Sequence, residues 1–307
     1  MNAIVGYSGF VGSNLYTPDR FQAAFNSKNI EEAYGLKPDI LVYAGVRAEK
    51  YLANHDPQKD LQNIKQAESN IERIQPKKLV LISTIDVFKT PIGVDETAPI
   101  ETNSLHAYGY NRFLLEQWVR SNFPDALILR LPGLFGKNLK KNFIYDYIHV
   151  IPSMLNDAKF LELNKKDHRL QQYYMPLENG FWKVTASEND RPMLKKIFFE
   201  IGFSALNFTD SRSKFQFYNL ERLWNDIQIA LKNDIHLLHL ATEPISVADI
   251  YRYLSGKEFI NELEWAPAYY DYKTIYDSSF GRKDGYICDQ VTILREIKNF
   301  VKVAQLQ

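Results

Sequence analysis

Three glycines near the start of the chain have the type and spacing needed to hold a phosphate. Gly6, Gly9 and Gly12 stand at every third position, after the apolar, strand-like run Ala3–Val5. A backbone that turns sharply and lets an anion approach closely needs residues without a Cβ atom. A helix is expected to open at 13–15, and its unpaired amides and positive dipole end would stabilise that anion. The pattern therefore predicts a nucleotide site, and the alternative is an ordinary glycine-rich turn.

The next strand and the loop after it bear on which dinucleotide is bound. Pro18 ends the first helix early, so only one or two turns are expected. Phe21–Phe25 is expected to be the second strand, whose end faces the adenosine ribose in dinucleotide folds. The following residues, Asn26, Ser27 and Lys28, include no acid for a ribose hydroxyl. Lys28 suits a 2′-phosphate, which favours NADP over NAD, unless it is a solvated loop lysine.

Strands alternate with helices along the first half of the chain. Apolar runs predict strands at 39–43, 79–82 and 126–131, and helical spacing predicts helices at 61–74 and 110–121. This alternation is typical of α/β proteins with a doubly wound, Rossmann-like parallel sheet, whose ligands bind beyond the carboxyl ends of the strands. The residues expected to bind a dinucleotide are Gly6, Ser8, Gly9, Phe10, Val11, Gly12, Asn26, Ser27, Lys28, Ala44, Gly45, Ser83 and Pro132.

From about Lys137 onward, strands and helices are no longer predicted to alternate regularly. Helices are expected at 146–155, 193–201, 220–231, 247–254 and 293–303, and a late strand at 237–240. Residues 1–136 with about 210–242 are expected to form a dinucleotide-binding domain. Residues 137–209 with about 243–307 are expected to form a smaller, intertwined substrate-binding region.

Composition and charge narrow the class of protein. Lysine plus arginine and aspartate plus glutamate both number 37, so nucleic acid and membrane surfaces are not expected partners. Cys288 is the one cysteine, which excludes an intrachain disulfide and a cysteine-cluster zinc site, and no metal is expected. No basic and apolar leader opens the chain, and no apolar run approaches about 18 residues. We therefore expect a cytoplasmic protein.

Two segments carry a resemblance to a known family. Leu79–Phe88 reads LVLISTIDVF and Ala107–Glu116 reads AYGYNRFLLE. With the early GYSGFVG, their order and spacing resemble the extended short-chain dehydrogenases/reductases, the NAD-dependent epimerase/dehydratase group. RLPGLFG at Arg130–Gly136 and LATEPISVADI at Leu240–Ile250 are similar to later parts of that family. The resemblance covers nearly the whole chain and implies NAD(P) as cofactor.

The resemblance implies roles for Tyr108, Thr84 and Arg112. In this family a Tyr-x-x-x-Lys pair and an upstream Ser or Thr act on a substrate alcohol or ketone, and the lysine also binds the nicotinamide ribose. Here Tyr108 falls on the tyrosine, Thr84 on the hydroxyl residue and Arg112 on the lysine. A phenol, with a pKa of about 10, needs a nearby cation to act as a base near neutral pH. Arginine keeps the charge of lysine without its geometry, so Arg112 is compatible with a working redox site or an altered one.

Two further residues near Tyr108 are candidates for proton transfer. Sugar-nucleotide dehydratases of the family carry an acid pair after the threonine, and here Ile85 replaces the first acid, which argues against dehydration. Asp86 stands at the position of the second acid, the base, or is a hydrogen-bonding loop residue. His106 is either a proton carrier or a polar turn residue.

The family's usual substrate is a nucleoside-diphosphate sugar, whose diphosphate needs cationic and amide donors. Candidates are Lys140, Asn142, Arg212 and Lys214, each of which has the alternative of a solvated surface residue. The aromatic run Tyr269–Tyr272 is suited either to stacking on a base or sugar or to the core.

Two functions are compatible with these residues. One is an NAD(P)-dependent 4-ketoreductase or epimerase of a nucleotide-activated sugar, supplying a surface glycan. The other is a dinucleotide-binding sensor or assembly subunit that keeps the fold and has altered chemistry. The resemblance also implies a homodimer.

Overall fold

The computed structural model describes residues 1–306, and the chain forms two compact units. The first unit is made of Met1–Leu139, Lys214–Ser246 and Ala268–Ile297. The second is made of Lys140–Ser213, Val247–Pro267 and the residues from Lys298 onward. Among residues 1–306 no helix is both long enough and apolar enough to cross a membrane.

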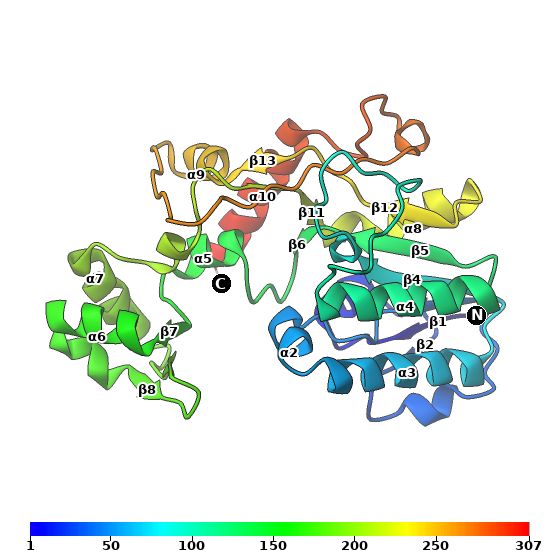
Figure 1. The fold of residues 1–307 in the computed structure, drawn as a ribbon, viewed down its shortest axis with the longest axis horizontal. Helices are drawn as coiled ribbons and strands as arrows, with labels where there is room; N and C mark the ends of the chain where they lie inside the picture. The colour runs from blue at the N-terminus through cyan, green and yellow to red at the C-terminus, as the bar shows by residue number, and fades with distance from the viewer. Residues whose placement is uncertain (307) are drawn as a thin grey trace. The chain divides into compact units, whose positions relative to one another are not determined.

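A six-stranded sheet is the centre of the first unit (Figure 1). In spatial order its strands are β12 (Leu237–His239), β5 (Leu127–Leu131), β4 (Lys78–Thr84), β3 (Ile40–Tyr43), β1 (Asn2–Val5) and β2 (Ala23–Phe25). Every neighbouring pair is parallel. The chain passes outward from β1 to β2 and then returns to the other side of β1, so its direction reverses between β1 and β3. The predicted doubly wound α/β fold is confirmed.

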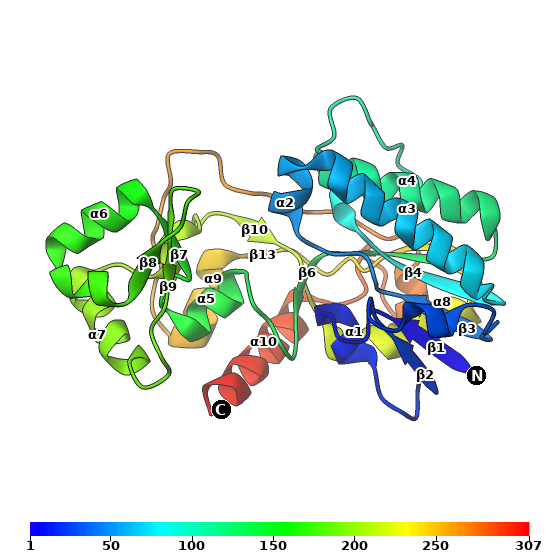
Figure 2. The same ribbon diagram turned by 90° about the horizontal axis from the view of Figure 1, so that it is seen from below.

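Helices α3 (Pro57–Ile74) and α4 (Ala107–Asn122) pack on one face of this sheet, as Figure 2 shows. Alternate strand residues point to that face and meet the apolar stripes of both helices. The opposite face is also covered, because Ile4 and Val42 are fully buried and Phe21 packs on Trp224. The core between the sheet and helices α3 and α4 contains Ala3, Val5, Leu41, Tyr43, Leu79, Leu81 and Ile128 from strands, with Ile64, Ala67, Ile71, Ile74, Leu115 and Val119 from helices.

Both long helices begin earlier than the sequence predicted because of their caps. At α3 the Asp56 carboxylate accepts a hydrogen bond from the Lys59 amide, and Pro57 takes the first helical position. At α4 the ring Nδ1 of His106 accepts a hydrogen bond of 3.0 Å from the Gly109 amide. This cap places Tyr108 within the first turn of α4.

Further strands and helices complete the first unit. Two strand pairs lie outside the main sheet: β6 (Gly133–Phe135) with β11 (Phe217–Asn219), which is parallel, and β10 (Lys214–Phe215) with β13 (Ile245–Ser246), which is antiparallel. The remaining helices are α1 (Phe10–Leu15), α2 (Lys50–His55), α8 (Leu223–Lys232) and α10 (Gln290–Gln305), whose last turns belong to the second unit. Single turns of 3₁₀ helix occur at Ile30–Ala33, Ile85–Val87, Leu220–Arg222 and Asp277–Phe280.

The segment Ala268–Ile297 belongs to the first unit, whereas the sequence placed it in the substrate-binding region. Its backbone bridges other parts of the first unit three times, through Tyr269 to Lys214, through Asp271 to Ile92 and through Cys288 to Thr242. Tyr272 is fully buried in an apolar cluster that includes Ile85, Val87 and Phe88. Burial of these aromatic side chains explains why the segment packs in the first unit. The local sequence pattern could not predict this, because it does not reveal which core a late segment joins.

The second unit contains the antiparallel sheet β7-β9-β8, formed by β7 (Met154–Asn156), β9 (Phe181–Val184) and β8 (Tyr174–Pro176). Its helices are α5 (Phe143–His149), α6 (Asp157–Lys166), α7 (Arg191–Ile201) and α9 (Val247–Ser255), with 3₁₀ turns at His168–Gln172 and Ala205–Phe208. The predicted helix 146–155 is wrong. Helix α5 ends at His149 because Val150 has a φ of 65°, and Pro152 follows.

The turn between β1 and α1 is possible only with glycine at two positions. Gly6 has a φ of 89°, and a Cβ atom there would overlap the carbonyl group of Ala44, which follows β3. A Cβ atom at Gly12 would overlap the carbonyl oxygen of Gly6. The absence of side chains thus lets β1, α1 and the end of β3 approach one another closely.

We expect Gly12→Ala to lower the free energy of unfolding by about 3 kcal/mol, because backbone atoms must shift to admit the methyl group. The matched control is Gly35→Ala, where φ is 74° and the Cβ position is open. Strain at positive φ alone should make that control cost about 1 kcal/mol. Urea unfolding measures both values, and equal losses in the two variants would contradict the close approach.

Candidate active site

The glycine turn lies at the point where the sheet reverses direction. Helix α1 begins at Phe10 with Gly9 as its N-cap, three residues before the predicted start at Ser13. The first-turn amides, which include those of Val11 and Gly12, have no acceptor within the helix. Ligands of doubly wound sheets bind in the crevice outside the strand ends at such a reversal. Free amides at a helix start and glycines without side chains are the features that a pyrophosphate needs, so this turn could hold that group of a dinucleotide.

The loop after β2 lies beside the glycine turn. The Asn26 amide group lies 3.4 Å from the Ser8 hydroxyl, and its oxygen accepts a hydrogen bond of 2.9 Å from the Lys28 amide. Asn29 fixes the same loop by accepting from the Asn26 amide at 2.8 Å. Ser27 and Lys28 are exposed. The residues predicted for the adenosine end are thus brought together with those predicted for the phosphates.

A second set of polar contacts joins α1 to the loop after β6. The Asn14 side chain donates to the Lys137 carbonyl at 2.8 Å and accepts from the Lys137 amide at 2.9 Å. Asn138 donates to the Ser13 hydroxyl at 3.2 Å. These contacts fix the orientation of α1, and sequence reasoning missed them.

Tyr108 and Thr84 are brought together as predicted from the resemblance. Thr84 is the last residue of β4, and Tyr108 is in the first turn of α4. The Tyr108 side chain is buried, and the Thr84 hydroxyl is near enough to its phenol to lower the pKa of that group. A Cβ atom at Gly109 would overlap the Asp86 carbonyl oxygen, so α4 approaches the end of β4 more closely than any other residue would allow.

Arg112 is held in a buried ion pair. Its guanidinium group donates to the Asp60 carboxylate and to the Arg47 carbonyl, both at 2.5 Å, and to the Tyr108 carbonyl at 3.2 Å. The same group lies over the Tyr108 ring, 3.9 Å from the ring centroid. Arg112 therefore contacts the face of the phenol ring, and its charge is matched by that of Asp60.

Burial dominates the ionisation of Tyr108. Removal from water raises the pKa of the phenol above its ordinary 10.0, and the negative charges of Asp86 and Asp60 act in the same direction. The positive charge of Arg112 and the Thr84 hydrogen bond lower the pKa but do not cancel the effect of burial. Tyr108 is thus protonated near neutral pH and suited to donate a proton.

Asp86 has two partners from distant parts of the chain. The Lys50 ammonium group of α2 lies 3.1 Å from its carboxylate, and the Tyr270 hydroxyl donates to it at 3.3 Å. Burial and the nearby charge of Lys50 lower the pKa of His106, the cap of α4. His106 is therefore a neutral capping residue near neutral pH.

At the ends of the strands, the predicted cofactor site is lined by backbone groups more than by side chains. The Ser83 hydroxyl donates to the buried Glu116 carboxylate at 2.5 Å, which in turn pairs with Arg130 at 2.6 Å. Only the backbone of Ser83 therefore remains for a cofactor. Ala44 and Gly45 directly follow β3, and Pro132 directly follows β5.

The residues predicted for substrate phosphate are divided between the units. Lys140, Asn142 and Arg212 belong to the second unit, and Lys214 belongs to the first. The Asn142 oxygen caps α5, and Arg212 pairs with Asp210 at 2.6 Å. Lys140 is exposed, and Lys214 lies 5.6 Å from the centroid of the Tyr269 ring.

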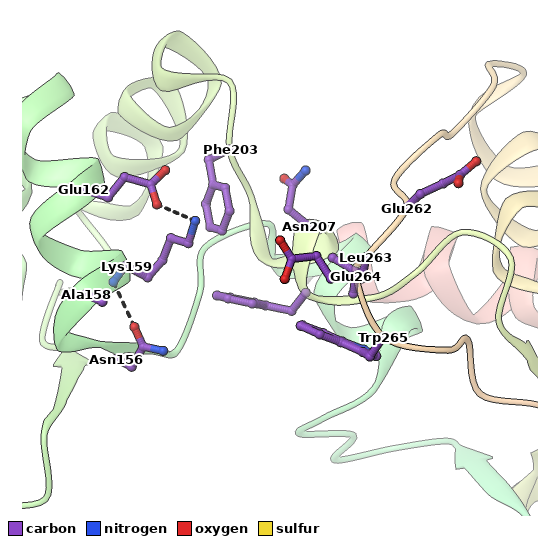
Figure 3. Close-up of a pocket in the computed structure, with 11 residues that line it drawn as sticks. Asn156, Ala158, Lys159, Glu162, Phe203, Asn207, Glu262, Leu263, Glu264 and Trp265 are labelled. Atoms are coloured by element: carbon purple, nitrogen blue, oxygen red, sulfur yellow. Dashed lines mark hydrogen bonds and ion pairs between the residues drawn. The ribbon is translucent and has the colours of Figure 1, made fainter.

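The second unit also contains a cavity of about 470 Å³ (Figure 3). Phe203, Phe208 and Trp265 contribute aromatic rings to its lining. Its acidic residues, Glu162, Glu262 and Glu264, outnumber the single cation Lys159, which pairs with Glu162 at 2.6 Å. This charge balance disfavours a diphosphate in the cavity.

Sequence reasoning also missed Asp60, Asn54, Lys50 and Gly109. Asp60 continues the buried stripe of Ile64, Ala67 and Ile71 on α3, and an acid on such a stripe indicates a buried partner. The glycine directly after Tyr108 was a second usable signal. Nothing in the local pattern singled out Lys50 or Asn54.

We expect Arg112→Met to lower the free energy of unfolding by about 3–5 kcal/mol, because it leaves the buried Asp60 carboxylate without its partner. Adding Asp60→Leu should recover most of that loss. Arg120→Met on the same helix is the control, since its side chain is 49% exposed, and it should cost about 1 kcal/mol or less. Equal stability of the Arg112 and Arg120 variants in urea unfolding would contradict a structural ion pair.

Comparison with known proteins identifies the fold. No family model and no curated protein sequence matches the chain. A dTDP-4-dehydrorhamnose reductase from Bacillus anthracis with NADP has a TM-score of 0.62 and 16% identity over 98% of this chain and 97% of its own. The same reductase from Yersinia enterocolitica has a TM-score of 0.63 and 14% identity over 99% of both chains. A UDP-glucuronic acid 4-epimerase variant from Bacillus cereus with NAD has a TM-score of 0.59 and 15% identity over 100% and 99%. The chain therefore has the fold of the extended short-chain dehydrogenases/reductases, as its sequence motifs predicted.

Proposed function

We propose that this protein is an NAD(P)-dependent reductase of a keto group on a nucleoside-diphosphate sugar, in the synthesis of a surface-glycan precursor. The observation that carries the proposal is the buried Tyr108 phenol beside Thr84, whose hydroxyl lowers the pKa of that phenol. Support also comes from the activities of the similar structures, which include nucleotide-sugar reductases and epimerases. The first unit would bind the dinucleotide, and the second unit would bind much of the sugar nucleotide.

The reaction needs a proton at the substrate oxygen. A bound reduced nicotinamide would supply the hydride to the carbonyl carbon. The Tyr108 hydroxyl gives its proton to the carbonyl oxygen as negative charge develops there, and the Thr84 hydroxyl binds the same oxygen. Arg112 keeps the ring of Tyr108 in place through its stacked guanidinium group.

The ionisation of Tyr108 favours reduction over epimerisation. Epimerisation through a ketone begins by removing a proton from a substrate alcohol, which requires a phenolate. The raised pKa of Tyr108 makes the phenolate scarce, whereas reduction uses the protonated phenol that predominates. Ketone reduction is accordingly the reaction that these residues support best.

Lys28 supports NADPH as the preferred donor. It is exposed on the loop that Asn26 joins to Ser8, and the neighbouring residues Asn26 and Ser27 are not acids. A 2′-phosphate would gain an ion pair there. The expected preference for NADP over NAD therefore stays part of the proposal.

The second candidate is a dinucleotide-binding sensor. It is favoured by the pairing of Arg112 with Asp60, which leaves no unmatched charge on that arginine to stabilise a phenolate. Fluorescence titration with both cofactors, followed by turnover assays on a panel of keto sugars, separates the two. Tight cofactor binding without any turnover would favour the sensor.

We expect Tyr108→Phe to lower kcat with NADPH and dTDP-4-dehydrorhamnose by about 10³-fold, because the proton donor is lost. Binding of NADPH, followed by its fluorescence, should stay within about twofold of wild type. Tyr110→Phe is the control, since that side chain is 39% exposed on the same helix, and it should retain full activity. Turnover at the wild-type rate in Tyr108→Phe would refute the assignment.

The pH profile gives an independent check. Because the reduction uses protonated Tyr108 and the pKa of this phenol lies above 10.0, its ionisation should not lower kcat/KM between pH 7 and about 9. Activity should fall only as the pH rises through the raised pKa. A decline centred below pH 9 that disappears in Tyr108→Phe would contradict this ionisation state.

A further inference from the structure

We propose that Lys50 is a positioning residue that compensates the charge of Asp86 while Tyr108 gives up its proton. The inference rests on the proposed reduction and adds to it a residue from α2, far from the motifs that indicated the site. It follows from the placement of α2 and from the balance of charges around the phenol.

Helix α2 contacts the site at two points from one face. The Asn54 side-chain oxygen accepts a hydrogen bond of 2.9 Å from the Tyr108 amide. The Lys50 ammonium group lies 3.1 Å from the Asp86 carboxylate. Lys50 and Asn54 are four residues apart, so one helical face carries both contacts. The short helix is thus attached to the start of α4 and to Asp86 together.

Two ion pairs lie near Tyr108, and neither pair has a net charge. Arg112 and Asp60 form one pair, and Lys50 and Asp86 form the other. His106 lies beside Tyr108, and Tyr270 and Tyr272 lie near Asp86; burial lowers the pKa of His106 and raises the pKa values of the two tyrosines, so these three groups are neutral near pH 7. Proton donation by Tyr108 adds one negative charge, and without Lys50 the same step would leave two.

The two ion pairs differ in their freedom to respond. In the Arg112–Asp60 pair both side chains are buried, with exposures of 6% and 8%, and three acceptors hold the guanidinium group. In the Lys50–Asp86 pair the exposures are 41% and 20%. The Lys50 ammonium group can therefore adjust its position as charge develops, while Arg112 cannot. This difference assigns the compensating role to Lys50.

The first test removes the charge and then restores it. Lys50→Met should lower kcat about tenfold with little change in KM, and Lys50→Arg should keep most of the activity. Lys50→Ala should regain activity when ethylammonium is added, which a purely structural role would not allow. The control is Lys59→Met, an equal charge change on an exposed residue of α3. Unchanged kcat in Lys50→Met, or loss of activity without rescue by arginine or ethylammonium, would overturn the inference.

The second test asks whether Lys50 acts through Asp86. Adding Asp86→Asn to Lys50→Met removes the uncompensated charge, so the double variant should be more active than Lys50→Met alone. A double variant no more active than Lys50→Met would overturn the role of Asp86.

A third measurement needs no turnover. Alkaline titration of the ultraviolet difference between each protein and its Tyr108→Phe counterpart follows the Tyr108 phenol alone. Lys50→Met should raise its pKa by about one unit, and the double variant should reverse the rise. An inactive wild type that shows this shift would refute the reductase proposal and keep the charge coupling. An active wild type without the shift would refute the coupling alone.

Discussion

The close approach of α4 to the end of β4 is the constraint on which the candidate site depends. Gly109 has no side chain, and any Cβ atom there would overlap the Asp86 carbonyl oxygen. This contact sets the first turn of α4 against the loop after β4, and so brings the Tyr108 phenol to the Thr84 hydroxyl. His106 caps the helix, and the Asn54 side-chain oxygen accepts a hydrogen bond from the Tyr108 amide. A larger residue at 109 would separate the two groups even if both remained in the sequence.

Around this contact, burial and charge oppose each other. A buried phenol resists ionisation, while a proton donor must carry negative charge for part of each reaction. Two ion pairs lie near the phenol, and they differ in how deeply they are buried. The Arg112–Asp60 pair fixes the ring, and the Lys50–Asp86 pair lies nearer to water. The contact with the ring and the pairing of Asp86 are thus divided between two residues, Arg112 and Lys50.

The parts of the site that could be predicted from sequence are those encoded locally. The glycine turn follows from spacing, and Tyr108 with Thr84 follows from two short motifs. The partners of these residues could not be predicted, because they come from far along the chain: 52 residues separate Asp60 from Arg112, and 184 separate Asp86 from Tyr270. Helix starts were missed where the caps were Asp56 and His106. The unit that Ala268–Ile297 joins depends on which core buries Tyr272. The local sequence pattern does not indicate which core that is.

The spacing of the strands links the two halves of the candidate site. The glycine turn follows β1 and Thr84 ends β4, and these two strands are separated only by β3. Neighbouring strands lie about 4.8 Å apart, so the turn and Thr84 stand about 10 Å apart along one edge of the sheet. A dinucleotide that lies across β3 would have to pass over Ala44 and Gly45. The carbonyl of Ala44 is also the group that excludes a side chain at Gly6. The close packing of the glycine turn on the end of β3 therefore fixes the backbone of both segments at this edge of the sheet.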